Sequence, residues 1–197
     1  MTQHMNAQET EEGRGSSYVT RKLLEARTIL VFEPISDAVA RRLHTQLVIL
    51  QKAEASAPVT VYINSPGGSA DSGFAMFDAL RFFDMPVTTV VNGLCASAAV
   101  MVQLAAPRQR RFAAPNARFL LHQPRTVARG QASDIEIEAG QMLRIREQYN
   151  AIVAQECGKT VAQVTKDSDR DFWLDAEQAR AYGLVSKIAG KLSDLGV

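Results

Sequence analysis

The sequence has few of the residues and patterns that mark several large classes of protein. Its two cysteines, Cys95 and Cys157, are too few for a disulfide framework and lack the spacing of a metal site. Its formal net charge is only +1, so the composition does not indicate a nucleic-acid partner. No apolar run reaches the length of a membrane span. We therefore expect a chain that binds no metal, contacts no nucleic acid and does not span a membrane.

A targeting signal and a nucleotide-binding motif are also missing. The N-terminus lacks the basic-then-apolar order of a secretion signal, and three glutamates before Gly13 are atypical of an organelle transit peptide, so we expect a cytoplasmic protein. Gly158-Lys159-Thr160 is similar to the end of a phosphate-binding loop, but Val153 stands where the first glycine of that loop belongs. The sequence therefore predicts that the chain itself binds no nucleotide and needs no cofactor.

The patterns that are present indicate an α/β chain. Hydrophobic residues make up 46% of it and charged residues 22%, as in soluble globular proteins. Residues 1–17 are polar, and we expect them to form a flexible arm before a single domain over 18–197, which would start with a short helix over 18–26. Short apolar runs typical of buried parallel strands alternate with helical patterns, which predicts βαβ units. The expected strands are 28–32, 59–63, 87–91 and 117–121.

The longest helical pattern runs from Ser133 to about Cys157. Ser133 and Glu136 form the sequence pattern of a capping box, and Gly158 suits a helix C-cap. Such a helix is long for a domain of this size. We therefore expect it to protrude and to bury its apolar face against another subunit.

Three neighbouring arginines stand between the expected strands over 87–91 and 117–121. Arg108, Arg110 and Arg111 form a run of like charge, which is usually solvated. We interpret them as a solvated turn, with an interface as the alternative.

Chemistry is suggested where the strands end. Ser97 follows a buried strand and precedes a buried helix, so its hydroxyl could face a cleft beside the free N–H groups of that helix. Gly68 lies in a turn after the preceding strand and could offer another backbone donor. His122 ends a strand, at the edge where open α/β sheets hold their sites. An acidic loop, 167–171, abuts an apolar trio. Each feature alone is equally consistent with packing.

Taken together, these residues resemble the family of proteolytic subunits of the Clp protease (ClpP). The order and spacing of the matching segments agree over roughly 18–188. These segments are 62–68, 93–97, 122–124, 130–137, 170–171, 177–179 and 182–185.

The resemblance implies a ClpP/crotonase-like fold of repeated ββα units with a protruding handle helix. It also implies a serine endopeptidase in which Ser97 attacks the scissile carbonyl, His122 is the general base and Asp171 orients the imidazole and raises its pKa. The N–H groups of Gly68 and Ala98 would form the oxyanion hole. The substrate-binding residues implied by the family are Gly67, Gly68, Pro124, Arg125, Thr126 and Val127.

The family also implies an assembly. Two stacked seven-membered rings, a homo-tetradecamer, enclose a chamber into which a separate AAA+ ATPase feeds unfolded protein chains. The long helix would lie at the ring-ring interface, where Arg170 would contact Asp169 or a glutamate of the opposing ring. ATP would be used by the partner unfoldase and not bound by this chain.

The sequence differs from the family at two places, and two other functions are considered beside the peptidase. Thr126 and Val127 replace glycines that are usual in the substrate-lining segment, and the N-terminal arm lacks the family's apolar start. A crotonase-type enzyme acting on acyl-CoA thioesters shares the paired N–H oxyanion hole. A ClpP-like ring subunit without catalytic activity is the third possibility.

Overall fold

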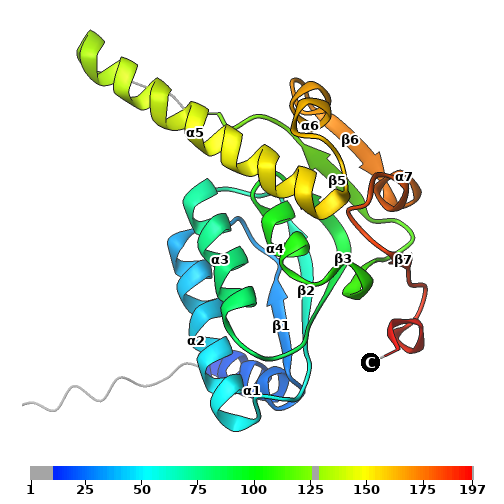
Figure 1. Ribbon diagram of the computed structural model, residues 1–197. Helices are drawn as coiled ribbons and strands as arrows, with labels where there is room; N and C mark the ends of the chain where they lie inside the picture. Colours follow the sequence, from blue (N-terminus) through cyan, green and yellow to red (C-terminus); the bar gives the residue numbers. More distant parts are fainter. Residues whose placement is uncertain (1–10, 126–128, 197) are drawn as a thin grey trace, which may run out of the picture.

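The computed structural model describes residues 11–125 and 129–196 (Figure 1). Thr126 and Val127, which were expected to line the substrate, lie outside the described residues. The strands are β1 (Thr28–Val31), β2 (Val59–Ser65), β3 (Val87–Ala96), β4 (Arg111–Ala113), β5 (Arg118–Leu121), β6 (Phe172–Asp175) and β7 (Lys187–Ile188). The helices are α1 (Glu11–Glu25), α2 (Asp37–Ala53), α3 (Ala70–Phe82), α4 (Ala99–Ala105), η1 (Arg108–Arg110), α5 (Ala132–Cys157), α6 (Val161–Asp167), α7 (Ala176–Tyr182) and η2 (Leu192–Leu195).

One seven-stranded sheet organises the chain. Its order is β1-β2-β3-β4-β7, and β5 pairs with both β3 and β6. Every pair is parallel except β5 with β6, which confirms the expected parallel α/β architecture. β3 is the central strand: its residues 89–91 pair with β4, and its residues 94–96 pair with β5. β3 therefore continues beyond Val91, where we expected it to end, and carries the chain directly to Ser97.

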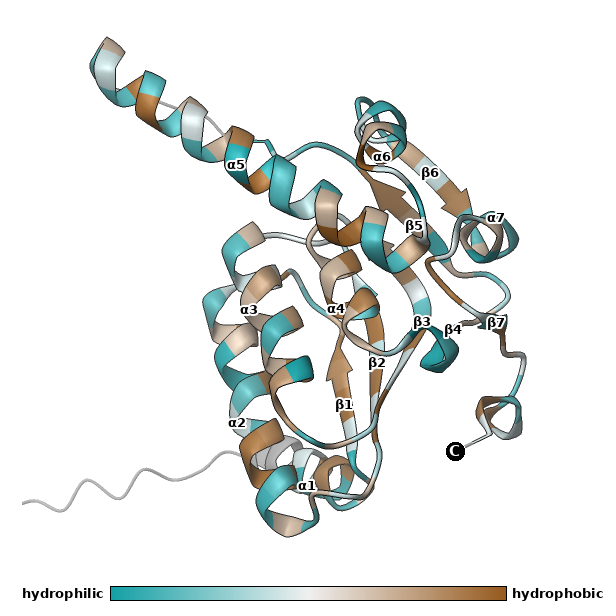
Figure 2. Ribbon diagram, in the orientation of Figure 1, coloured by the Kyte–Doolittle hydropathy of each residue, from teal (hydrophilic) through white to brown (hydrophobic). Residues whose placement is uncertain are grey.

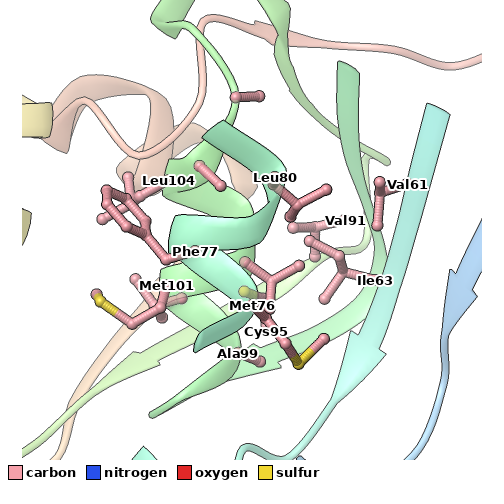
Figure 3. Close-up of a cluster of buried hydrophobic side chains, with 14 of the residues drawn as sticks. Val61, Ile63, Met76, Phe77, Leu80, Val91, Cys95, Ala99, Met101 and Leu104 are labelled. Carbon is pink, nitrogen blue, oxygen red and sulfur yellow. The ribbon is translucent and has the colours of Figure 1, made fainter. Parts of the chain in front are cut away.

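The apolar faces of α2, α3 and α4 pack against this sheet. Ser36 caps α2 by accepting from the backbone of Val39, and the apolar stripe of α2 is buried. All seven residues of α4 are buried, so this helix is held from every side. Figure 3 shows Met76 and Leu80 of α3 packed with Val91 and Cys95 of β3 beneath α4. Burial of apolar surface stabilises the folded chain by about 25 cal/mol per Å². This packed region forms the base on which the site lies.

The first helix and the longest helix begin earlier than the sequence suggests. α1 starts at Glu11, well before Tyr18. α5 starts at Ala132 with Gln131 as its N-cap, and no side chain caps it, so the expected capping box of Ser133 and Glu136 is wrong. Gln131 has the extended backbone that an N-cap requires, which leaves Ser133 inside the first turn. Gly158 ends α5 in the left-handed conformation, as predicted.

α5 projects beyond the body of the molecule (Figure 1). Its buried residues all lie between Tyr149 and Cys157, and its residues 132–139 are all exposed. Ile135, Ile137 and Leu143 are exposed on this helix as apolar side chains among polar ones (Figure 2). Although α5 has 26 residues, neither it nor any other helix in the described ranges is long and apolar enough to cross a bilayer.

The expectation that the arginine cluster is solvated is wrong at Arg111. This residue of β4 has 0% exposure, and burial lowers the pKa of its guanidinium. Its Nε donates to Ala106 O (2.7 Å), and its Nη2 donates to Leu104 O (3.0 Å) and to the Glu156 carboxylate. The same carboxylate pairs with Arg81 of α3 at 2.6 Å. The Arg81–Glu156–Arg111 network, as we call it, thus joins α3, β4 and α5.

Candidate active site

Ser97 occupies a strained turn between β3 and α4. It has φ +55°, which is uncommon for a residue with a side chain and typically costs about 1–3 kcal/mol. Three hydrogen bonds hold the backbone there: Ser97 N–H donates to Leu120 O (2.8 Å), and Ser97 O accepts from Val100 N (3.0 Å) and from the Tyr149 hydroxyl (3.3 Å). A sheet strand, a helix turn and α5 therefore all fix the position of this one residue.

The turn after β2 packs directly against the Ser97 turn, and only glycine fits there. A Cβ at Gly67 would lie 2.5 Å from Ala96 O and 2.7 Å from the Ser97 Cβ, and a Cβ at Gly68 would lie 2.2 Å from Ile35 O. Both glycines also have positive φ. Because no side chain shields it, the Gly68 N–H is accessible. Within the described residues, neither this N–H nor that of Ala98 donates to a protein acceptor, as an oxyanion hole requires.

A cavity of about 440 Å³ opens beside these two turns. Several of the site residues predicted from the sequence line it: Gly68, Ser97, Ala98, His122, Pro124 and Arg125. Gly67 packs behind the Ser97 turn instead of lining the cavity. The remaining wall is mainly apolar, from Phe74, Met101, Met142, Ile145 and Tyr149. The arrangement suits an apolar side chain held next to a serine hydroxyl.

His122 follows β5 and is only partly engaged with Asp171. Its Nδ1 is buried without a hydrogen-bond partner among the described residues and lies 3.8 Å from Asp171 Oδ1. That oxygen instead accepts from Arg125 Nη2 at 2.5 Å. No hydrogen bond between described residues joins the Ser97 hydroxyl to His122. The structure thus gathers Ser97, His122 and Asp171 at one site without forming the hydrogen bonds of a triad.

The pKa of His122 is lowered from its ordinary value of 6.5, which is the opposite of the expected direction. Partial burial disfavours the imidazolium and is the largest cause, and the positive charge of Arg125 adds to it. Asp171 acts in the other direction but does not compensate. The imidazole is therefore neutral, and able to accept a proton, to a lower pH than the sequence suggested.

The two residues expected at the ring-ring contact lie on the surface next to this site. Asp169 Oδ1 accepts from Gln123 Nε2 at 2.8 Å within the same chain. Arg170 is exposed, and it makes no hydrogen bond or ion pair with another described residue. Its side chain is thus free to contact another molecule.

The described residues contain no cluster of three metal-ligating side chains, and both cysteines are buried. Burial raises the pKa of the Cys157 thiol to about 12 and that of Cys95 further, so neither is a thiolate at neutral pH. Cys95 is part of the buried core, and Ser97 is the nucleophile candidate.

Sequence analysis missed the roles of Tyr149 and Arg125. The sequence does not single out Tyr149, yet its hydroxyl donates to the backbone carbonyl of Ser97. Burial raises the pKa of this phenol well above 10.0, so it remains a donor. A buried tyrosine normally finds a hydrogen-bond partner, which was the available signal. No pattern in the sequence indicates that Arg125 contacts Asp171.

Comparison with known proteins assigns the chain to a family. The model of the family described as Clp protease matches residues 11–191. The chain belongs to the Clp protease family. It is 43% identical to ATP-dependent Clp protease proteolytic subunit 2 of Treponema pallidum (strain Nichols), over 97% of this chain and 98% of that protein. It is 42% identical to the proteolytic subunit 3 of Rhizobium etli (strain ATCC 51251 / DSM 11541 / JCM 21823 / NBRC 15573 / CFN 42), over 88% of this chain and 89% of that one.

A solved structure agrees with this membership of the Clp protease family. A mutant form of ClpP1 from Listeria monocytogenes superimposes with a TM-score of 0.83 at 37% identity, covering 90% of this chain and 99% of that one. The resemblance inferred from the sequence is confirmed, together with the ClpP fold. The acyl-CoA alternative is not favoured.

Proposed function

We propose that this chain is a serine endopeptidase that cleaves unfolded proteins with Ser97, His122 and Asp171. The observation that carries the proposal is the junction of two turns: a strained serine lies between two backbone N–H groups, of Gly68 and Ala98, that have no acceptor among the described residues. Such a junction suits a tetrahedral oxyanion. His122 lines the same cavity.

Peptide hydrolysis follows from these positions in two steps. Ser97 Oγ attacks the carbonyl carbon while His122 takes its proton, and the carbonyl electrons move onto an oxygen held by the Gly68 and Ala98 N–H groups. The intermediate collapses, the C–N bond breaks, and the imidazolium gives the proton to the leaving amine. Water then attacks the acyl-enzyme with His122 again as base. Asp171 stabilises the imidazolium in both steps when it lies next to Nδ1.

The assembly we propose is a homo-tetradecamer of two stacked rings that receives substrate from an AAA+ unfoldase in the cytoplasm. The names of the relatives, proteolytic subunits of an ATP-dependent protease, support this arrangement. The uncovered apolar residues of α5 supply a surface that a second ring would bury. Contact of Arg170 with an acidic residue of that ring belongs to the same proposal. ATP is used by the unfoldase, so no cofactor is proposed for this chain.

Labelling with a fluorophosphonate probe, followed by mass-spectrometric mapping, tests the proposed nucleophile. We expect modification of Ser97 alone, and complete loss of labelling and peptide hydrolysis in Ser97→Ala with unchanged sedimentation. Ser69→Ala is the matched control, because Ser69 lines the same cavity but its hydroxyl caps α3. Intact rings without any labelled serine would identify a non-catalytic subunit. Acyl-CoA turnover without peptidase activity would indicate a crotonase-type enzyme.

A further inference from the structure

Asp171 lies within reach of two basic side chains. Its Oδ1 accepts from Arg125 Nη2 at 2.5 Å, while His122 Nδ1 lies 3.8 Å away with no other partner among the described residues. A catalytic imidazole needs that Nδ1–H bonded to the carboxylate, because the bond sets the tautomer that accepts the serine proton. Oδ1 is the Asp171 oxygen within reach of both side chains, and here it is hydrogen-bonded to Arg125 and not to His122. The present geometry places Arg125 where His122 should be bonded.

Among the described residues, Asp171 is the acid with which Arg125 forms an ion pair. The titratable groups around His122 are Asp171, Asp169 and Arg170 on the segment before β6, Arg125 on its own segment, Asp71 of α3 across the cavity and Tyr149 of α5. Of the two nearest acids, Asp169 already accepts from Gln123. Both ends of the Arg125–Asp171 pair reach solvent, with side-chain exposures of 70% and 45%, whereas His122 is 16% exposed.

We propose that Arg125 is a positioning residue that competes with His122 for Asp171 and thereby limits the fraction of molecules with an assembled triad. The inference rests on the proposed peptidase function of this site. In the first state Arg125 binds Asp171 and the imidazole is unoriented. In the second state Arg125 turns to solvent or to another anion, and Asp171 moves to His122. No covalent step differs between the two states; only the number of competent molecules changes.

The size of the effect follows from the exposure of the pair. Exposed ion pairs shift an equilibrium by only about two- to fivefold, because water screens them and long side chains lose entropy. Removing the Arg125 charge should therefore raise kcat by about two- to fivefold. Salt screens exposed charges over about 10 Å at 0.1 M and about 3 Å at 1 M. The ratio of kcat in Arg125→Gln to kcat in wild type should therefore fall toward one as the salt concentration increases.

The pH profile separates positioning from mere packing. Arg125 lowers the pKa of His122 directly by its charge and also withholds the carboxylate that raises it. Neutralising Arg125 removes both effects, so the pKa of His122 should rise. The acid limb of kcat/KM, where His122 loses its proton, should accordingly move to higher pH in the variant, while the plateau activity increases.

The test compares three variants of the full chain at equal assembly state, checked by sedimentation. Arg125→Gln removes the competing charge, Arg125→Lys retains a cation, and Arg180→Gln removes an arginine that pairs with Glu177 on α7 away from the site. Peptide hydrolysis is measured against pH and salt for each. We expect higher kcat and a raised acid limb in Arg125→Gln, a smaller change in the same direction in Arg125→Lys, which keeps the cation, and no change in Arg180→Gln.

Several outcomes would overturn the proposal while leaving the peptidase function intact. If wild type is active and Arg125→Gln has the same pH profile, Arg125 does not compete with His122 for Asp171. A change confined to KM would make Arg125 a substrate-binding residue. A kcat ratio independent of salt would exclude ionic competition. Failure of the peptidase function is distinct: wild type and all variants would then lack both hydrolysis and fluorophosphonate labelling.

Discussion

Two clusters in this molecule each place one carboxylate between two basic side chains, and they differ in how completely their polar atoms are paired. In the Arg81–Glu156–Arg111 network, Glu156 bonds to both arginines at once. At the active site, Asp171 bonds to Arg125 and leaves His122 Nδ1 without a partner among the described residues. The first cluster is fully paired in one arrangement, whereas our proposal gives the second cluster two alternative arrangements. Complete pairing of the polar atoms around Glu156 indicates a structural role, whereas the incomplete pairing around Asp171 suits the role proposed for it in catalysis.

Burial explains the difference. Arg111 has 0% exposure and Glu156 12%, so an unpaired charge there would lose its hydration without compensation. The backbone carbonyls of Leu104, Ala106 and Glu156 accept the other N–H groups of Arg111. Around Asp171, water is available as a partner, and exchanging one partner for another costs little. Only the second environment allows a carboxylate to change partners during a reaction.

The largest effect is expected from breaking the buried cluster. Glu156→Gln leaves Arg111 without its counter-charge and should lower the free energy of unfolding by about 3–5 kcal/mol. Chemical denaturation measures this change. Glu177→Gln is the control, because Glu177 pairs with Arg180 on the surface, and it should change stability by less than about 1 kcal/mol. Equal effects of the two substitutions would contradict a special role for burial.

Substitution of Asp171 should change the rate of peptide hydrolysis and not the free energy of unfolding. Asp171→Asn keeps the shape of the side chain but presents the wrong hydrogen-bonding group to His122. Where a triad is fully formed, this change costs about 10⁴ in kcat. If Arg125 competes for Asp171 as proposed, the loss should be two- to fivefold smaller, about 2–5 × 10³-fold, measured by peptide hydrolysis. Unfolding should occur at the same denaturant concentration as in wild type; a stability loss comparable to that of Glu156→Gln would make Asp171 structural.

A moderate effect is expected on the pH dependence of wild-type activity. The folded chain binds a proton at His122 less readily than a free histidine does, since burial and Arg125 lower its pKa. Activity should therefore rise with pH through a midpoint below 6.5 and be complete near neutrality. A kcat/KM profile over about pH 5 to 8 measures it. A midpoint above 6.5 would mean that Asp171 already bonds to His122 in the working enzyme.

Local sequence patterns predicted most of the fold but only part of this contrast. The alternation of apolar runs and helical patterns predicted β1, β2, β3 and β5, because hydrophobic periodicity is a local property. The position of Ser97 between strand and helix was predictable for the same reason. The pairing of Arg111 with Glu156 and of Asp171 with Arg125 was not, because the partners lie more than 40 residues apart along the chain. In the sequence, Arg111 is one of three neighbouring arginines and its burial among backbone carbonyls is not evident.

The smallest effect, and the one that connects the two clusters, concerns Tyr149. Tyr149 and Glu156 lie two turns apart on the same face of α5, so a single helix contacts both the Ser97 turn and the buried network. Tyr149→Phe removes one hydrogen bond of 3.3 Å to Ser97 O, which still accepts from Val100. A buried hydrogen bond contributes about 0.5–1.5 kcal/mol, and the stability loss should lie in that range. Because the strained backbone of Ser97 loses one of its three restraints, kcat should also fall, by about three- to tenfold.

Tyr182→Phe separates these two consequences of Tyr149→Phe. The Tyr182 hydroxyl donates to Asp167 Oδ2 at 3.0 Å, away from the cavity, so its loss should lower stability without changing kcat. The acid limb of the pH profile should stay in place in both variants, because neither tyrosine bonds to His122 or Asp171. A Tyr149→Phe enzyme with unchanged kcat would show that α4 and β5 suffice to hold Ser97. A reduced kcat in that variant alone would show that α5, which also carries Glu156, transmits its position to the nucleophile.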